Sequence, residues 1–327
     1  MRILNHDDVR ASLSPAECAS AMAEVLAALA RGELHNPLRS VVRPPSAAGL
    51  MGLMPAHRSG DRSLFALKAV CVMPSNPADH GLDAHQGAVL LSAGETGELL
   101  AVIDASAITA IRTAAVSAVA TRALARAGAS TLAVLGAGTQ GAAHIEAHVA
   151  TMQPARIVLW SRRGEQARAL ADRLSAELGI AIEVAESVQA ALADADVICT
   201  TTAAREPIVE RASIKAGAHV NAVGSSIPTT RELDSRTMGE AALFVDRRES
   251  TLNESGDFLF AQADGALDAE SIRAELGEVL AGLAPGRRDA HEITVFKSLG
   301  LAVEDLAAAE LALRNAEVAG RGTVVDW

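Results

Sequence analysis

A glycine-rich turn is the stretch of this sequence whose residue types and spacing most clearly indicate chemistry. The apolar run Leu132–Leu135 leads into GAGTQG at 136–141, and a helix-like segment follows. A strand, a glycine turn and a helix start in this order are the context in which GxGxxG indicates a dinucleotide site. Gly136 allows the tight turn, Gly138 lets the backbone approach a pyrophosphate, and Gly141 lets the helix pack closely on the strand.

The pyrophosphate of such a cofactor accepts hydrogen bonds from the free N–H groups at the positive end of the helix. The competing interpretation is an ordinary glycine-rich turn, and the strand and helix alternation that follows favours the cofactor. We expect the turn to bind it through Gly136, Gly138, Thr139, Gln140 and Gly141.

The residues after the second strand of this region bear on which dinucleotide is bound. A carboxylate at that strand end, about 20 residues past the glycines, holds the ribose 2′-OH of NAD. Here the strand Arg156–Trp160 is followed by Ser161, Arg162 and Arg163. Arginine offers a planar, bidentate donor fork that suits a phosphate. The sequence therefore predicts NADP(H) as the preferred cofactor, with NAD(H) possible; the alternative is that both arginines are solvated residues that open the next helix.

Three cations outside the glycine region are candidates for binding an anion. Lys68 lies in the apolar strand pattern 64–73, on the same face as Leu64, Ala66 and Val70. A lysine there needs an anionic partner, or the strand lies at a sheet edge where lysine prevents aggregation. From spacing alone, both interpretations remain open.

Arg112 occupies a largely apolar face of an Ala-rich helix, and Arg39 lies in the short strand pattern 38–43. Surface roles explain most isolated arginines. Together with Lys68, these two arginines would form a clamp for a substrate carboxylate. His144 and His148 share a helix face, but a zinc site needs at least a third ligand, so we predict no metal site. His85 we interpret as structural.

Composition excludes several classes of protein. The net charge of −11 over 327 residues argues against nucleic acid as a partner. No apolar run is expected to reach the roughly 20 residues of a membrane span, and the N-terminus has no signal-peptide core. Cys18, Cys71 and Cys199 lie in apolar runs and are expected to be buried free thiols. We therefore expect a cytoplasmic protein that binds neither nucleic acid nor membrane.

Hydrophobic patterns divide the chain into two kinds of region. Ser14-Pro15-Ala16-Glu17 forms a capping box before a helix that runs to about Arg31. Short strand patterns follow at 38–43, 49–54, 64–73, 86–92 and 99–103, then a helix over 106–127. Strands and helices then alternate to about residue 246, region 249–285 is helical and loop-rich, 293–299 is a strand or loop, and 303–319 is a closing helix.

This pattern predicts an α/β fold, in which a Rossmann doubly wound parallel sheet is inserted into a mixed α+β domain. We place the first domain at 1–115 plus 303–327 and the NAD(P)-binding domain at 116–302.

The sequence resembles the ornithine cyclodeaminase/mu-crystallin family along almost its whole length. The matching stretches are Met54-Pro55, Leu67-Lys68, HQGAVLL (85–91), ITAIRTAAVSAV (108–119), GAGTQG, NAVGSSIPTTRELD (221–234), NESGD (253–257), ELGEVLAG (275–282) and VFKSLGLAVED (295–305). The resemblance implies that the mixed α+β domain is a substrate-binding and dimerisation domain, in a homodimer whose N-terminal sheets pair across the subunit interface. It also implies either cyclodeamination of ornithine or lysine, or NAD(P)H-dependent reduction of ketimines or formation of alanine.

By position, the resemblance assigns roles to individual residues. Arg39, Lys68 and Arg112 correspond to the ligands of the substrate carboxylate, and Ser161, Arg162 and Arg163 to the 2′-phosphate position. The resemblance also places a further set beside the cofactor: Thr113 at the pyrophosphate, and Val223, Gly224, Ser298 and Leu299 near the nicotinamide.

One position departs from the cyclodeaminases of the family. Where they carry an aspartate that takes part in proton transfer, this chain has Ser226. A serine cannot act as a carboxylate base near neutral pH, which undermines oxidation of an amine more than reduction of an imine. We therefore expect an NADPH-dependent reductase of Δ1-pyrroline-2-carboxylate or Δ1-piperideine-2-carboxylate, in which Lys68 and Arg112 are catalytic and Ser226 contacts substrate. The alternatives are an ornithine cyclodeaminase with bound NAD, an alanine-type dehydrogenase, and a non-catalytic protein that binds NADPH and a small ligand.

Overall fold

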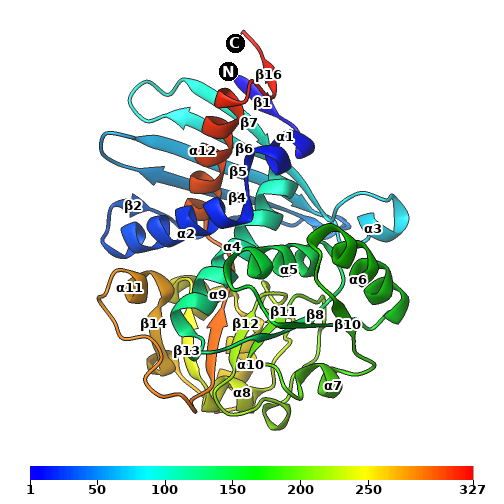
Figure 1. The fold of residues 1–327 in the computed structure, drawn as a ribbon. Helices are drawn as coiled ribbons and strands as arrows, with labels where there is room; N and C mark the ends of the chain where they lie inside the picture. Colours follow the sequence, from blue (N-terminus) through cyan, green and yellow to red (C-terminus); the bar gives the residue numbers. More distant parts are fainter. Residues whose placement is uncertain (327) are drawn as a thin grey trace. The chain divides into compact units, whose positions relative to one another are not determined.

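The computed structural model describes residues 1–326, and its contacts divide the chain into two compact units. The first comprises Met1–Arg112 and the C-terminal segment from Gly300 onward. The second is the continuous segment Thr113–Leu299. Each has a sheet of its own (Figure 1).

The first unit is built on an eight-stranded mixed sheet in the order β16-β1-β7-β6-β5-β4-β2, with β3 paired to β4. Only β1 and β7 run parallel; the other pairs are antiparallel. The strands are β1 (Arg2–Leu4), β2 (Leu34–His35), β3 (Ser40–Val42), β4 (Leu50–Arg58), β5 (Leu64–Val72), β6 (His85–Ala93), β7 (Leu99–Asp104) and β16 (Thr323–Val324). The predictions of β3 to β7 are confirmed, and the short β1, β2 and β16 went unpredicted.

Helices cover this sheet because its apolar positions alternate. On β5, Leu64, Ala66 and Val70 are buried, while Phe65 on the opposite face is exposed. The helix α12 (Ala302–Val318) packs on β4, β5 and β6 and against α2 (Pro15–Ala30) (Figure 1). The remaining short helices of this unit are α1 (His6–Ser12) and α3 (Asn76–Asp79).

The start of α2 confirms Ser14 as the N-cap but forms only half of the predicted capping box, because the Glu17 carboxylate accepts from the Ser14 hydroxyl in place of the Ser14 backbone N–H. The Ser14 hydroxyl accepts from the Glu17 N–H at 3.4 Å and donates to the Glu17 carboxylate at 2.7 Å. Pro15 occupies the first turn, where its missing N–H costs no hydrogen bond.

The expectation about apolar runs is wrong for one helix. The helix α4 (Ala105–Leu124) is long and apolar enough to cross a membrane, but 83% of its most apolar window is buried in the protein. We therefore interpret it as a core helix. The helices α1 and α2 pass the same test only as a pair, and they are bent by 82°. The helix α4 ends at Leu124, so the prediction that it extends to residue 127 was three residues too long.

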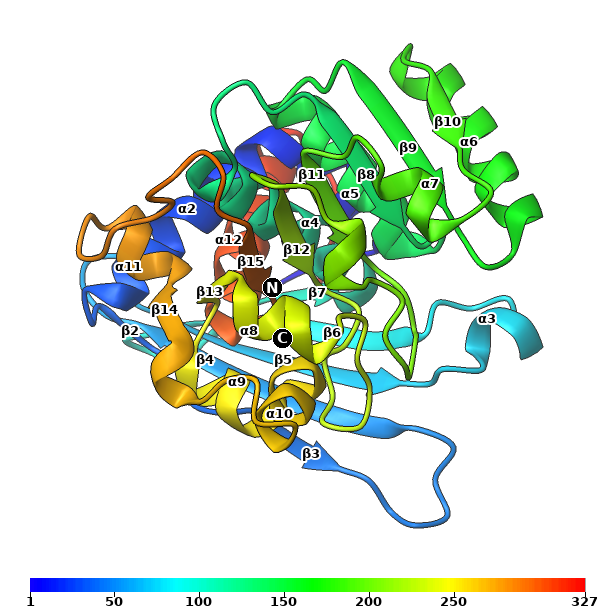
Figure 2. The same cartoon turned by 90° about the horizontal axis from the view of Figure 1, so that it is seen from below.

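The second unit is an eight-stranded parallel sheet in the order β10-β9-β8-β11-β12-β15-β13-β14 (Figure 2). The strands are β8 (Thr131–Leu135), β9 (Arg156–Trp160), β10 (Ile182–Val184), β11 (Val197–Thr200), β12 (His219–Ala222), β13 (Ala242–Val245), β14 (Ile272–Glu275) and β15 (Thr294–Lys297). The connecting helices are α5 (Thr139–Thr151), α6 (Gly164–Leu178), α7 (Val188–Leu192), α8 (Ser235–Glu240), α9 (Arg248–Glu254), α10 (Gly256–Ala263) and α11 (Leu276–Leu280), with two 3₁₀ turns at Arg211–Ser213 and Ala269–Ser271.

In the second unit, the residues of the central strand β8 alternate between two hydrophobic cores. Leu132 and Val134 of β8 pack in a core with α5 and α6, whereas Ala133 and Leu135 pack in a core that includes residues of α7, α8 and α10. A parallel sheet covered on both faces is the doubly wound arrangement. The predicted fold class is confirmed.

Two predictions in this part of the sequence analysis were wrong in detail. The region 249–285 contains a strand, β14, which pairs with β13 and escaped notice because IRAE has no apolar run. Of the three free thiols, Cys18 and Cys199 are buried as expected, but Cys71 is only half-buried.

Candidate functional site

The glycine turn of the second unit has a different steric constraint at each glycine. Gly136 has φ = +123°, and a Cβ there would lie 2.7 Å from the Thr201 carbonyl oxygen. A Cβ at Gly141 would lie 1.9 Å from the Gly136 carbonyl oxygen. A Cβ at Gly138 would meet no protein atom within 4 Å. The first and third glycines are therefore required by the fold, and the second borders open space.

This turn fits the pyrophosphate of a dinucleotide. Gly138 is the N-cap residue of the 13-residue helix α5, and no side chain caps that end. The dipole of α5 favours an anion at this end of the helix. Thr139 is exposed and Gln140 half-buried on the first turn of α5.

At the end of β9, Ser161 is half-buried and Arg162 and Arg163 are both exposed. Within residues 1–326, neither guanidinium has an ion-pair partner. In the same strand, by contrast, Arg156 pairs with Glu183 at 2.6 Å. The two arginines that follow β9 are thus available to an external anion.

The carboxyl ends of β11 and β12 are joined by Glu232, which the sequence analysis missed. Its fully buried carboxylate accepts from Gly224 N–H at 2.8 Å and from Thr202 N–H at 2.7 Å. It also accepts from the Thr200 hydroxyl at 2.7 Å. Burial raises the pKa of Glu232, and the threonine hydrogen bonds oppose that shift. Val223, next to Gly224, is buried, and Ser226 is half-buried.

A buried ion pair ties the end of β15 to the same segment. Lys297 donates to Asp257 at 2.9 Å, and both side chains are fully buried. Asp257 also accepts from the backbone N–H of Glu232 at 2.8 Å. The next residue, Ser298, is buried, and within residues 1–326 its hydroxyl has no hydrogen-bond partner. A buried hydroxyl of this kind fits a site that a polar group of a cofactor completes.

The backbone of Leu299 is also fixed in place, because its N–H donates to the Asp246 carboxylate at 2.5 Å. Parallel sheets bind ligands outside the carboxyl ends of their strands. Val223, Gly224, Ser298 and Leu299 all follow such ends, and Thr113 is a buried residue of α4. The side chains of this unit therefore fit a nicotinamide dinucleotide.

In the first unit, Lys68 lies in the middle of the sheet. Its strand β5 is flanked by β4 and β6, so the interpretation of Lys68 as an edge-strand residue is wrong. Lys68 is 2% exposed. Its ammonium donates to Asp305 Oδ1 at 2.9 Å, lies 2.8 Å from Asp305 Oδ2, and donates to the Thr109 hydroxyl at 3.4 Å.

Arg112 shares the same carboxylate. Its Nε donates to Asp305 Oδ1 at 3.0 Å, and its Nη1 donates to Glu304 Oε2 at 2.6 Å. Arg39 is half-buried and donates to the Gly300 carbonyl at 3.2 Å. Glu304 and Asp305 lie in the first turn of α12. They were assigned no role from the sequence, although they lie inside a matching motif.

Burial lowers the pKa of Lys68 to about 8. Asp305 opposes that effect, while the positive charges of Arg112 and Arg39 add to it. The pKa of Arg112 is raised, because the carboxylates of Asp305 and Glu304 outweigh its burial. Lys68 and Arg112 are thus two buried cations that share the Asp305 carboxylate, and the charge of Arg39 also acts on Lys68.

The paired histidines of α5 are held by hydrogen bonds. His144 contacts the Ser117 hydroxyl at 2.9 Å and His148 contacts the Thr121 hydroxyl at 3.0 Å. Burial lowers the pKa of His144 to about 3 and that of His148 to about 4. In the described part of the chain, no three potential ligands gather into a metal site.

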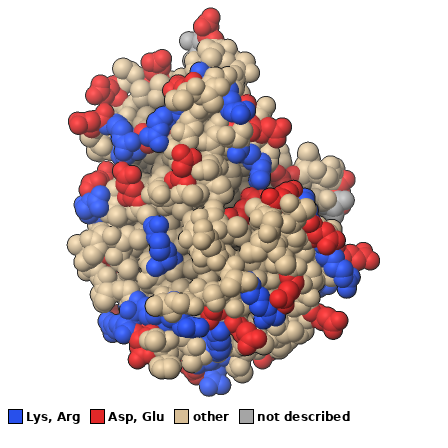
Figure 3. All heavy atoms as spheres, viewed as in Figure 1, with Lys and Arg blue, Asp and Glu red and all other residues tan. Residues whose placement is uncertain are grey.

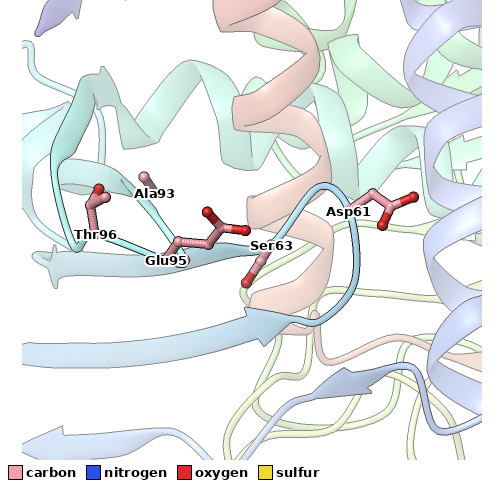
Figure 4. A pocket seen from close by; sticks show the side chains of 6 residues that line it. Asp61, Ser63, Ala93, Glu95 and Thr96 are labelled. Carbon is pink, nitrogen blue, oxygen red and sulfur yellow. The ribbon is translucent and has the colours of Figure 1, made fainter.

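A separate cavity of about 230 Å³ lies in the first unit, between the loop before β5 and the turn that joins β6 to β7 (Figure 4). Asp61 and Glu95 line it, together with Ser63 and Thr96. None of the predicted site residues lines this cavity, and its two carboxylates would repel an anionic substrate.

The fold and site together define a dinucleotide-binding α/β protein with a buried cationic cluster in its other unit. The model of the ornithine cyclodeaminase/mu-crystallin family matches residues 1–319, and the chain belongs to this family. It is 42% identical over 280 residues to ketimine reductase mu-crystallin of Mus musculus, covering 86% of this chain and 85% of the relative.

Two solved structures are similar over their whole length. The Thermococcus litoralis Δ1-pyrroline-2-carboxylate reductase in complex with NADH and L-proline has a TM-score of 0.96 and 35% identity, covering 99% of this chain and 100% of that one. An archaeal alanine dehydrogenase dimer with bound NAD has a TM-score of 0.92 and 31% identity, covering 100% and 99%.

The glycine geometry predicts that two alanine substitutions separate binding from folding. Gly138→Ala should leave the melting temperature unchanged, because its Cβ enters open space, and should weaken NADPH binding by about tenfold or more because that space receives the pyrophosphate. Gly141→Ala should destabilise the fold by more than about 1 kcal/mol through its clash with Gly136. Thermal unfolding and nicotinamide fluorescence titration measure both. Unchanged NADPH affinity in Gly138→Ala would contradict the assignment.

Proposed function

We propose that this protein reduces a cyclic ketimine carboxylate with NADPH: Δ1-pyrroline-2-carboxylate to L-proline, or Δ1-piperideine-2-carboxylate to L-pipecolate. The observation that carries the proposal is the cluster of three cations formed by the buried Lys68 and Arg112 and the half-buried Arg39, since cations of this kind suit a substrate carboxylate. The relatives named above as reductases of ketimines and of Δ1-pyrroline-2-carboxylate support the same chemistry.

In the proposed reaction, Arg39, Lys68 and Arg112 bind the carboxylate and so fix the orientation of the neighbouring imine carbon. Orienting a bound reactant in this way removes much of the entropic part of the barrier. The reduced nicotinamide, when bound, supplies a hydride to that carbon. Reduction of the C=N bond also consumes one proton at nitrogen. Lys68 is the candidate to hold that proton at Nζ, because a pKa of about 8 suits proton donation near neutral pH.

The preference for NADPH over NADH rests on Ser161, Arg162 and Arg163. The two exposed guanidinium groups follow β9, where a carboxylate would stand in an NAD-selective protein. The Thermococcus litoralis relative is in complex with NADH, so NAD(H) is the alternative that an experiment has to compare.

A homodimer is part of the proposal. The face of the first sheet opposite Lys68 exposes apolar side chains on three neighbouring strands: Val42 at 51%, Met51 at 41% and Phe65 at 49%. An apolar sheet face of this kind is typical of a protein–protein contact, and the archaeal alanine dehydrogenase is described as a dimer. A monomeric mass in sedimentation equilibrium at micromolar concentration would contradict this part.

The reaction itself is tested by the loss of nicotinamide absorbance. Purified protein with Δ1-pyrroline-2-carboxylate should oxidise NADPH faster than NADH, and should form L-proline in equal amount. Parallel reactions contain pyruvate with ammonia, or ornithine without reductant. If ornithine releases ammonia and the imine is not reduced, the protein is a cyclodeaminase and the inference from Ser226 is wrong. If NADPH binds and no substrate turns over, the protein is a binding protein.

The 2′-phosphate assignment predicts a selective effect on one cofactor. The double variant Arg162→Ala, Arg163→Ala should raise the KM for NADPH about tenfold or more and leave that for NADH nearly unchanged, because only NADPH carries the phosphate. Arg173→Ala is the matched control, since Arg173 lies further along α6 and pairs with Glu177. Equal effects on both cofactors would overturn the assignment.

A further inference from the structure

One carboxylate near the start of α12 contacts two cations of the cluster formed by Lys68, Arg112 and Arg39. We infer that Asp305 is a positioning residue: its carboxylate fixes the ammonium of Lys68 and the guanidinium of Arg112 in one array and stabilises the protonated form of Lys68. The catalytic consequence of this inference rests on the proposed function, in which Lys68 holds the proton that the imine nitrogen receives.

The geometry of Asp305 carries this inference. Its Oδ1 accepts from Lys68 Nζ at 2.9 Å and from Arg112 Nε at 3.0 Å, and its Oδ2 lies 2.8 Å from Lys68 Nζ. Lys68 therefore directs its ammonium toward both oxygens of one carboxylate. Asp305 is 1% exposed, so water does not replace these contacts. A strand in the middle of the sheet and helix α4 both depend on it to place their cations.

A structural role alone accounts poorly for this arrangement. Removing two charges from water costs several kcal/mol per ion, and apolar residues of similar volume often stabilise a core more than an ion pair does. A shared carboxylate at the centre of an apolar sheet face is thus an expensive way to stabilise a fold. It is a direct way to keep a buried lysine charged and oriented.

The charges around Lys68 fix the direction of the effect. Asp305 is the negative charge that favours the protonated ammonium, while burial, Arg112 and Arg39 disfavour it. Among the described residues, the charged or titratable groups around Lys68 include Asp305 and Glu304 of α12, Arg112 of α4, His85 of β6, Asp83 before β6 and Arg39 before β3. Losing the carboxylate leaves the cations, so the pKa of Lys68 must fall.

A direct titration tests this without reference to catalysis. The chain has three lysines, Lys68, Lys215 and Lys297. Protein labelled with ¹³C at the lysine ε-carbon therefore gives three NMR signals, and Lys68→Arg identifies the one of interest. In the wild type this signal should titrate near pH 8; in Asp305→Asn it should titrate about 1 to 3 units lower. Lys215 pairs with Asp196 and Lys297 with Asp257, so their signals serve as internal controls.

Activity provides the second readout. Since protonated Lys68 is required, kcat/KM for the imine should fall on the alkaline side of the pH profile. Asp305→Asn should move that fall to lower pH by the same amount as it moves the NMR titration of Lys68. Asp305→Glu keeps the charge and should return the fall toward the wild-type pH. Glu304→Gln removes a partner of Arg112 and should raise the KM for the imine while leaving the alkaline fall in place.

The outcomes separate the inference from the proposed function. A Lys68 signal unmoved by Asp305→Asn, or one that titrates so far below pH 8 in the wild type that Lys68 is neutral near pH 7, overturns the inference, and the wild-type test applies even if the variant fails to fold. A Lys68 signal that moves as expected in a protein that reduces no imine supports the positioning role and refutes the proposed function.

Discussion

The fold of the first unit depends on how buried positive charge is balanced. Lys68 and Arg112 lie at 2% and 4% exposure, where an unpaired charge would be prohibitively costly. Glu304 and Asp305, at the start of α12, supply the compensating carboxylates. Arg39 adds a third positive charge that acts on Lys68. This concentration of cations lies in a chain whose net charge is −11. On the face seen in Figure 3, acidic and basic side chains are interspersed, so the surface in view offers no broad basic region.

In the second unit, buried carboxylates fix the positions of backbone groups. Glu232 accepts hydrogen bonds from the ends of β11 and β12, and Asp257 joins Glu232 to Lys297 at the end of β15. Buried carboxylates in this unit hold strand ends, where a parallel sheet binds its ligands. The glycine turn and the buried hydroxyl of Ser298 belong to the same edge of the sheet.

Local patterns in the sequence were sufficient to predict much of the fold and part of the candidate site. The alternation around Lys68 predicted its buried face, and the strand, turn and helix around Gly136 predicted the parallel sheet. The sequence analysis missed partners that are distant in the chain: Lys68 and Asp305 are 237 residues apart, so neither the ion pair nor the central position of β5 follows from spacing. Glu232 escaped for a similar reason, because a carboxylate that accepts from backbone N–H groups has no sequence pattern of its own. The strand β14 was missed because only its pairing with β13 makes it a strand.

The most direct test of the account compares two ligands that differ in one charge. L-proline carries the carboxylate that the cluster of Lys68, Arg112 and Arg39 should bind, and L-prolinamide replaces it with a neutral amide. Calorimetric titration of the protein saturated with NADP⁺ should give an affinity for L-proline at least about tenfold higher, a difference of about 1.4 kcal/mol. Equal affinities would show that the cluster of Lys68, Arg112 and Arg39 does not bind a carboxylate, and would contradict the account at its centre.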